Sequence, residues 1–320
     1  MDKASSDRRP TSLTQKAKTD YRFLVRPLRD RERIRLLLEP EPAYSAYALG
    51  QVEPELFSQS EWWLAQADGR EALLMHSRGG LGNALVTFGD SLALQALLSL
   101  HPGPAQTFAT FRVDHREALR QFFALAHDKP MLRMMVTTDS FAVPTDERAE
   151  AADGSEVRRL SDNDIPAVDR LYSSEGNRFY YRARRIEEGV YFGVFSDQQL
   201  VAVAGTHAVC RENGIAVVGN VFTHPSHRNN HFALRATGAV TETLLQTCQQ
   251  AVLTVAPENT AAIRAYSRLG YREECELIEC GVTRKETLGL GTLARRLLAR
   301  WRGHGKGGEL VTLADDEDED

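Results

Sequence analysis

A polar loop between a predicted strand and a predicted helix is the part of this chain best suited to bind an anion. The strand spans residues 215–223, the helix spans residues 231–248, and Arg228 stands between them. Free backbone N–H groups at a helix N-terminus, together with the helix dipole, attract phosphate groups. Asn229 and Asn230 tolerate left-handed backbone conformations, so the loop can turn without a glycine. The sequence therefore predicts a phosphate-binding turn at the start of this helix.

A second segment, residues 253–271, has the pattern of a buried strand, a turn, an amphipathic helix and a glycine stop. Asn259 can cap the helix through its side-chain oxygen. Tyr266 falls on the apolar face of the helix, and Gly270 supplies a left-handed residue at its C-terminus. On these residues alone, Tyr266 is either an ordinary core tyrosine or a group held over a site.

Both segments resemble signatures of the GNAT superfamily, the acyl-CoA-dependent N-acyltransferases. Residues 259–271 match the pattern N-x-x-A-x-x-x-Y-x-x-x-G-[FY] at every fixed position. Upstream, Pro225, Arg228 and Ala233 match the pattern V-x-P-x-x-[RQ]-x-x-G-x-[GA]. His231 stands at the central glycine of that second pattern, where its imidazole either obstructs a pyrophosphate or donates a hydrogen bond to it.

The resemblance implies an N-acetyltransferase that moves an acetyl group from acetyl-CoA to the amine of a small molecule or amino acid derivative. It implies that Tyr266 protonates the departing thiolate and that the backbone at Val221 and Thr223 pairs with the pantetheine arm. The residues it assigns to cofactor binding are Val221, Thr223, Arg228, Asn229, Asn230, His231, Phe232, Ala233 and Asn259. The alternative is a catalytically weakened GNAT-like acyl-CoA-binding or sensor module, which His231 favours.

The sequence does not single out a general base. Thr254 lies on the strand before the signature, and a hydroxyl of this kind cannot deprotonate an ammonium group. The remaining candidates in the second half are His207, Glu212, Glu175 and Glu279. No spacing rule chooses among them, and a water chain is a further alternative.

Composition restricts the class of protein. With 320 residues, of which 42% are hydrophobic, the chain can build two domains of ordinary size. There is no transmembrane run and no signal peptide in the sequence, and the cysteines are few, so we expect a cytoplasmic protein. The net charge of −5 includes six consecutive acids, Asp315 to Asp320, and without them the net charge of the chain would be +1. We therefore expect no nucleic-acid partner.

No metal site is predicted. His224, His227 and His231 have no neighbouring cysteine or acidic cluster in the sequence that would complete a ligand set. The four cysteines, Cys210, Cys248, Cys275 and Cys280, lack zinc-site spacing.

Composition also divides the chain into parts. We predict a disordered leader at 1–20, a degenerate GNAT-like domain at 21–143, a linker at 144–155, a GNAT acyltransferase domain at 156–282, a basic amphipathic helix at 283–302 and a disordered acidic tail at 303–320.

The two halves repeat one order of elements. The second half reads as strands at 156–160, 190–195, 200–210, 215–223, 251–255 and 271–280, with helices near 164–174, 178–188, 231–248 and 259–269. Residues 84–88, 91–100, 107–113, 115–126 and 131–138 repeat the last five elements in chain order, from the strand at 215–223 to the strand at 271–280. We therefore predict an α/β (α+β) fold of two GNAT-like lobes, each a mixed, mostly antiparallel twisted sheet flanked by helices. The alternative is a distinct helical or mixed N-terminal domain.

The first copy lacks the features of the second. Asp90 stands where its phosphate loop is expected, and a carboxylate there would repel pyrophosphate. Its counterpart of the signature helix, residues 115–126, carries no tyrosine. Four aromatic residues of this half either line an acceptor groove or pack in the core, and core packing is the interpretation that we favour; they are Tyr44, Tyr47, Trp62 and Trp63.

Residues 287–302 form a basic amphipathic pattern. Leu290, Leu293, Leu297 and Trp301 share one helical face, among four arginines. The pattern is shared by helices that lie on membrane surfaces and by helices that dock on proteins, and we favour docking. We expect the acidic tail to fold back on the arginines and the helix to be dispensable for cofactor binding.

Overall fold

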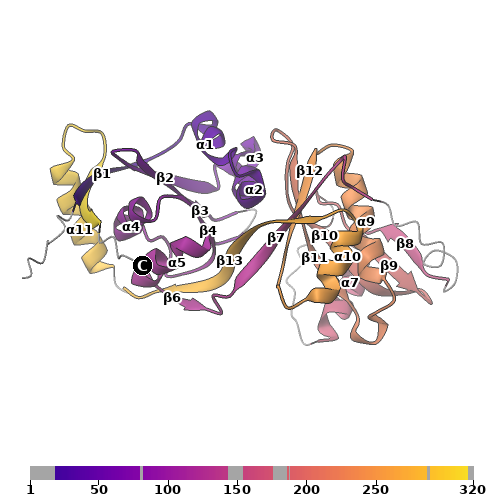
Figure 1. Ribbon diagram of the computed structural model, residues 1–320. Coiled ribbons are helices and arrows are strands. Elements are labelled where there is room, and N and C mark those ends of the chain that lie inside the picture. Colours follow the sequence, from indigo (N-terminus) through magenta and orange to yellow (C-terminus); the bar gives the residue numbers. More distant parts are fainter. Residues whose placement is uncertain are drawn as a thin grey trace, which may run out of the picture.

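One continuous sheet runs through two lobes, and Figure 1 shows them side by side. The computed structural model describes residues 19–79, 82–142, 154–175, 186, 188–286 and 289–315. The strands follow the order β14-β1-β2-β3-β4-β5-β13-β7-β12-β11-β10-β9-β8, and β6 also pairs with β13. The predicted two-lobed α/β fold is confirmed, and the alternative of an unrelated N-terminal domain is wrong.

The first lobe contains the strands that precede β7, with a layer of helices on each face of the sheet. Its strands are β1 (Thr19–Pro27), β2 (Ser60–Ala67), β3 (Arg70–Ser77), β4 (Ala84–Gly89), β5 (Gln106–Phe111) and β6 (Phe123–Ala126). Its helices are α1 (Arg31–Leu38), α2 (Pro42–Val52), α3 (Pro54–Phe57), α4 (Ser91–Leu100) and α5 (Arg116–Phe122). Helices α4 and α5 cover one face of the sheet in a core of leucine, alanine and phenylalanine, and α1 and α2 cover the other.

The second lobe repeats this plan. Its strands are β8 (Glu156–Arg159), β9 (Phe192–Ser196), β10 (Gln199–Cys210), β11 (Ile215–Thr223) and β12 (Gln250–Val255). Its helices are α7 (Ile165–Ser173), α9 (Phe232–Leu245) and α10 (Thr260–Arg268). Helices α9 and α10 pack on one face of the sheet, whereas α7 packs on the other.

The two lobes exchange their last strands. Strand β7 (Pro130–Thr137) comes from the first half of the chain, yet it pairs antiparallel with β12 of the second lobe. Strand β13 (Arg272–Arg284) comes from the second half, yet it pairs antiparallel with β5 of the first lobe. The two exchanged strands also pair with each other, and both cross between the lobes in Figure 1. The proposed domains, residues 21–143 and 156–282, therefore share strands rather than folding around separate sheets.

Helix α2 fills the space between the lobes. Nine of its eleven residues are buried, because it is apolar on nearly all sides. It packs on β10 and β11 of the second lobe and on the exchanged strands. Gly50 permits this close approach, since a Cβ atom at that position would lie 3.0 Å from the Cβ atom of Ala208. One hydrophobic core thus contains residues of both halves.

Two details of the predicted elements need correction. The helix predicted over residues 115–126 ends at Phe122, and the four residues that follow form β6 along β13. Residues 309–315, which fall in the predicted disordered tail, form β14 (Glu309–Asp315), which pairs with β1. Val311 and Leu313 are half-buried and alternate with the exposed Thr312 and Ala314, which is the strand pattern that the acidic composition obscured. Most of the leader, the linker and the helix near 178–188 lie outside the described residues.

The C-terminal helix docks with the face opposite to the predicted one. Helix α11 (Leu290–Arg302) packs on α4 and β14 through a face that includes Thr292 and Ala299. The apolar stripe that was expected to dock is exposed instead. The docked side includes an arginine, since Arg295 Nε donates to the Ser99 carbonyl at 3.0 Å.

Candidate functional site

Strands β11 and β12 separate part-way along their length. Their parallel ladder contains three residue pairs and ends at Val217 and Val252. Beyond that point β11 has a shifted register against β10, and Asn220 has a φ of 55°. An irregularity of this kind bends a strand and turns its side chains in a new direction. The free edge of β11 therefore faces an opening instead of its neighbour.

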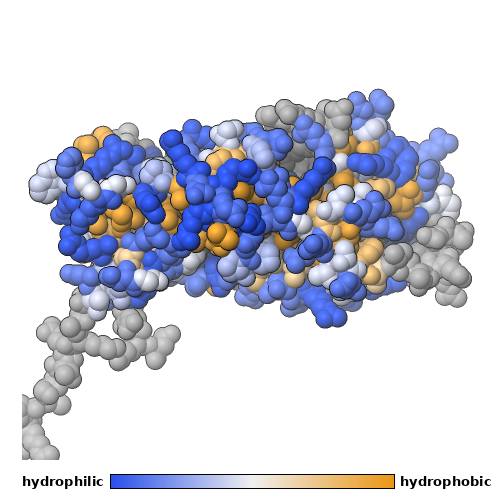
Figure 2. All heavy atoms as spheres, turned by 90° about the horizontal axis from the view of Figure 1, so that it is seen from above, coloured by the Kyte–Doolittle hydropathy of each residue, from blue (hydrophilic) through white to orange (hydrophobic). Residues whose placement is uncertain are grey.

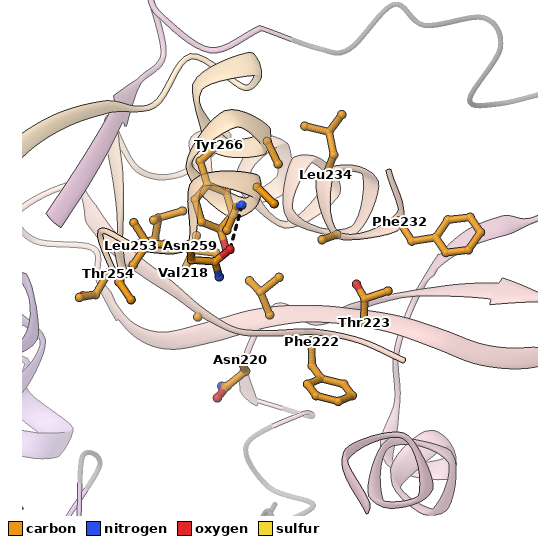
Figure 3. Close-up of a pocket in the computed structure, with 18 of the residues that line it drawn as sticks. Val218, Asn220, Phe222, Thr223, Phe232, Leu234, Leu253, Thr254, Asn259 and Tyr266 are labelled. Carbon is orange, nitrogen blue, oxygen red and sulfur yellow. Dashed lines mark hydrogen bonds between the residues drawn. The ribbon is translucent and has the colours of Figure 1, made fainter. Parts of the chain in front are cut away.

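A cavity of about 1060 Å³ occupies this opening. The predicted site residues that line it are Val221, Thr223, Arg228, Asn229, His231, Phe232, Ala233, Asn259 and Tyr266, whereas Asn230 does not. Figure 3 shows Thr223 pointing from β11 toward the α9 side, while Asn220 and Phe222 point to the other side. The Thr223 hydroxyl is buried and has no hydrogen-bond partner among the described residues, so it can bond to a ligand in the opening.

The loop before α9 turns through two left-handed residues, at Asn229 as the sequence predicts and at His231 instead of Asn230. Asn229 has a φ of 67° and His231 has a φ of 58°. His231 is the residue before the first turn of α9, and no side chain caps that helix. The N–H groups of the first turn therefore face the cavity without a side-chain cap, as a phosphate site requires.

Arginines surround this end of the cavity. Arg228 pairs with Glu175 at 2.5 Å. Arg264 and Arg268, which are one turn apart on α10, also line the cavity and are exposed. Arg268 Nη1 lies 3.4 Å from His231 Nδ1, which makes Nδ1 the acceptor and places the imidazole proton on Nε2. Together with the helix dipole, these charges favour an anion.

Tyr266 and Asn259 lie where strand β12 gives way to α10. The Asn259 side chain accepts a hydrogen bond from the Ala262 N–H at 3.1 Å, so the predicted cap is present, and Figure 3 marks it with a dashed line. Tyr266 is buried and lines the cavity. Burial raises the pKa of Tyr266 to about 12, so the phenol stays protonated at physiological pH.

The other end of the cavity is built at the junction of the lobes. Tyr47 of α2 and Glu279 of β13 line it, with Thr254 between them. The Thr254 hydroxyl donates to Glu279 Oε1 at 3.2 Å. Arg133 of β7 is fully buried, lies 3.6 Å from Glu279 Oε1 and stacks 4.8 Å from the centre of the Tyr47 ring. Burial raises the pKa of Glu279, although Arg133 and Thr254 act against that shift.

The equivalent opening in the first lobe is filled by its own side chains. Strands β4 and β5 also share only three residue pairs. Beyond them the Tyr44 hydroxyl donates to the Thr87 carbonyl at 2.6 Å, and His115 Nε2 donates to the Gly89 carbonyl at 2.8 Å. The Asp90 carboxylate accepts from the Ala93 N–H at 2.9 Å, which places a negative charge at the N-terminus of α4. A phosphate-bearing ligand there would meet an occupied strand edge and a repelling charge.

Several residues of this site are not selected by any motif in the sequence. Arg264 and Arg268 could have been found from their four-residue spacing on the signature helix. Glu279 was one of several candidate bases, and the strand exchange that brings it beside Arg133 has no local sequence signal. Of the four aromatics considered for an acceptor groove, Tyr47 lines the cavity, whereas Tyr44 and Trp62 are core residues and Trp63 stacks on His101.

Solved structures share this fold. A putative acetyltransferase of the GNAT family from Novosphingobium aromaticivorans is 20% identical, and the match covers 74% of this chain and 96% of that one with a TM-score of 0.50. A Drosophila protein is 12% identical, and the match covers 81% of this chain and 98% of that one with a TM-score of 0.56. At these identities the likeness concerns the fold.

The family comparison concerns the segment that holds the cavity. Residues 191–278 match the family model described as FR47-like protein. In fold, the chain is similar to a structure described as a GNAT-family acetyltransferase. The matched segment runs from β9 into β13 and includes the separated strands, the loop and Tyr266. Comparison with curated proteins gives no match.

Two further observations concern the part of the chain that the structure describes. Within it, no helix combines the length and the apolar character that a membrane crossing requires. Within the same residues, no three His, Cys, Asp or Glu side chains gather as a metal site would require. The rings of His224 and His227 lie 5.4 Å apart, next to the loop.

His231 gives a prediction that separates strain from binding. A left-handed conformation costs a non-glycine residue about 1 kcal/mol, so His231→Gly should raise the melting temperature by a few degrees. We expect the same variant to bind acetyl-CoA about tenfold more weakly, because Nε2–H is then absent as a donor to the pyrophosphate. Thermal unfolding and titration calorimetry measure the two effects.

His231→Asn is the matched control, since asparagine tolerates the left-handed conformation but does not reach as far. It should also bind acetyl-CoA more weakly than the unmodified protein. Tighter binding by His231→Gly would show instead that the imidazole obstructs the loop.

Proposed function

We propose that this protein is an N-acetyltransferase that moves the acetyl group of acetyl-CoA to the amine of a small molecule or amino acid derivative. The observation that carries the proposal is the opening between β11 and β12, which ends at the uncapped N-terminus of α9. The free strand edge can pair with the amide groups in the pantetheine arm of CoA. The helix N-terminus and the arginines can bind its phosphates.

The donor would extend from the loop to the junction of the lobes. Its pyrophosphate would lie on the N–H groups of Phe232 and Ala233, close to His231. Its pantetheine would pair with the free edge of β11 at Val221 and Thr223, where the Thr223 hydroxyl needs a partner. The thioester would then lie near Asn259 and Tyr266.

Acyl transfer from this position requires two proton movements. The neutral amine attacks the thioester carbonyl, a carbon–nitrogen bond forms, and the carbon–sulfur bond breaks. The attacking nitrogen loses a proton, and the thiolate gains one. Tyr266 is placed to give the second proton, because burial keeps its phenol protonated.

We assign Glu279 as the residue that binds the amine of the acceptor. It is the carboxylate at the lobe junction, and it lines the cavity at the end away from the arginine-rich loop. It would hold the acceptor ammonium group and take its proton. Arg133 would keep the carboxylate ionised, while Tyr47 would form the wall against which the acceptor lies. The first half of the chain thus contributes to the site through α2 and β7.

A second candidate function is an acyl-CoA-binding or sensor module. The strained His231 at the start of α9 favours it, because family members carry glycine in that place. The two functions differ in turnover. Release of free CoA thiol in the presence of an amine panel, measured with a thiol reagent, supports the enzyme, whereas binding of acetyl-CoA without release supports the module.

Tyr266→Phe tests the proposed acid. We expect turnover to fall by about a hundredfold or more while affinity for acetyl-CoA is unchanged, because the hydroxyl acts on charge that develops in the transition state. Steady-state kinetics with the best amine of the panel and calorimetry with acetyl-CoA separate the two. Full activity in Tyr266→Phe would make this residue structural.

If Glu279 is the base, kcat/KM should depend on pH in a specific way. A base works when deprotonated, and the pKa of Glu279 is raised, so the acidic limb of kcat/KM should lie above the usual range of a glutamate. Arg133→Met removes a charge that lowers this pKa, so the limb should move to higher pH, whereas Arg133→Lys should leave it nearly in place. Glu279→Gln should remove the limb and most of the activity. An unchanged profile in Arg133→Met and Glu279→Gln would contradict the assignment.

A further inference from the structure

Helix α11 exposes an apolar stripe that no described residue covers. The described chain has seven large hydrophobic side chains that are exposed, and five of them lie on this helix: Leu290, Leu293, Leu297, Leu298 and Trp301. Trp301 is 77% exposed and Leu290 is 67% exposed. Figure 2 shows hydrophobic atoms at the left end of the molecule, where Figure 1 places α11.

The helix is fixed in this orientation by its other face. Thr292 N–H and Oγ1 both donate to the Glu286 carboxylate. Arg300 Nε donates to Glu309 at 2.8 Å, and Ala299 is buried against the lobe. Because the polar face is the one that is docked, the apolar stripe must face outward, away from the lobe.

The surroundings of the stripe are positively charged. Residues 287–308 contain five arginines and lysines and no acid. Arg302 and Lys306 are exposed at the end of the helix that carries Trp301. An exposed tryptophan and leucines with flanking arginines are the composition of helices that lie in a bilayer interface.

The acidic residues after Asp315 do not match this stripe. Arg300 binds Glu309, the first residue of β14, and Asp315 is the last residue, about 20 Å farther along the strand. Residues 316–320 are all acidic, so none of them supplies apolar cover for the stripe. A second copy of the chain would supply apolar cover, but it would bring two basic helices together.

We propose that the exposed face of α11 binds the surface of an anionic lipid bilayer. Leu290, Leu293, Leu297 and Trp301 enter the interface, and Arg302 and Lys306 contact lipid phosphates. The helix lies at the opposite end of the molecule from the second lobe in Figure 1, so binding leaves the candidate acyl-CoA site open. The inference goes beyond the proposed function and does not depend on it.

Vesicle sedimentation with the full chain tests the proposal. We expect binding to phosphatidylcholine vesicles that contain about 30% phosphatidylglycerol, at least about tenfold weaker binding to phosphatidylcholine alone, and loss of binding at high salt. The Trp301 fluorescence should shift to the blue on binding, and brominated lipids should quench it.

Three variants identify the surface. Leu293→Ser with Leu297→Ser and Trp301→Ser should abolish binding, and Arg302→Gln with Lys306→Gln should reduce it about tenfold. Leu36→Ser with Phe108→Ser is the matched control, since these are the other two exposed large hydrophobic residues, and it should bind normally. Circular dichroism and thermal unfolding equal to those of the unmodified protein show that the variants are folded.

Three results would overturn the proposal. They are the absence of vesicle binding by the unmodified protein, equal binding to neutral and anionic vesicles, and a dimer that the triple α11 variant abolishes. The last result would assign the stripe to a second copy of the chain. The fluorescence of the unmodified protein tests the insertion of Trp301 even where the triple variant fails to fold.

Discussion

The exchange of β7 and β13 between the lobes is the interaction on which the rest of the structure depends. Each strand pairs with the fifth strand of the other lobe, and the two pair with each other where they cross. Neither lobe can complete its sheet from its own half of the chain. The exchange also carries Arg133 and Glu279 to the same point, from strands that are more than a hundred residues apart. The acceptor end of the cavity is thus a consequence of how the duplicated halves share strands.

The two lobes have one opening each, and the two openings differ in what they contain. In the second lobe, the free strand edge and the uncapped α9 face a cavity. In the first lobe, Tyr44 and His115 bond to the same part of β4, and Asp90 caps the following helix. Burial lowers the pKa of His115, so its ring is neutral and serves as a structural donor and acceptor. Internal hydrogen bonds thus occupy the opening of the first lobe, and Tyr47 of that lobe lines the cavity of the second.

Local patterns in the sequence were enough to predict most of the residues that line one side of the cavity. Asn259, Tyr266 and Gly270 lie within one turn-helix-turn segment, so their spacing fixes their geometry. The acceptor side depends on contacts between distant strands, and no local pattern reports which strand of a duplicated pair enters which lobe. The C-terminal residues show a second reason why the sequence alone was not enough. The acids of residues 315–320 dominated the composition, and they concealed an alternating strand that needs β1 as its partner.

The number of acetyl-CoA molecules bound per chain tests this account most directly. Titration calorimetry of the full chain should give one site, because one opening faces a cavity with a bare helix N-terminus and the other is filled by Tyr44, His115 and Asp90. Replacing Thr223 with valine should weaken that single site, and replacing Thr87 with valine should leave it unchanged. Two sites per chain, or a single site that responds to Thr87 and not to Thr223, would contradict the account.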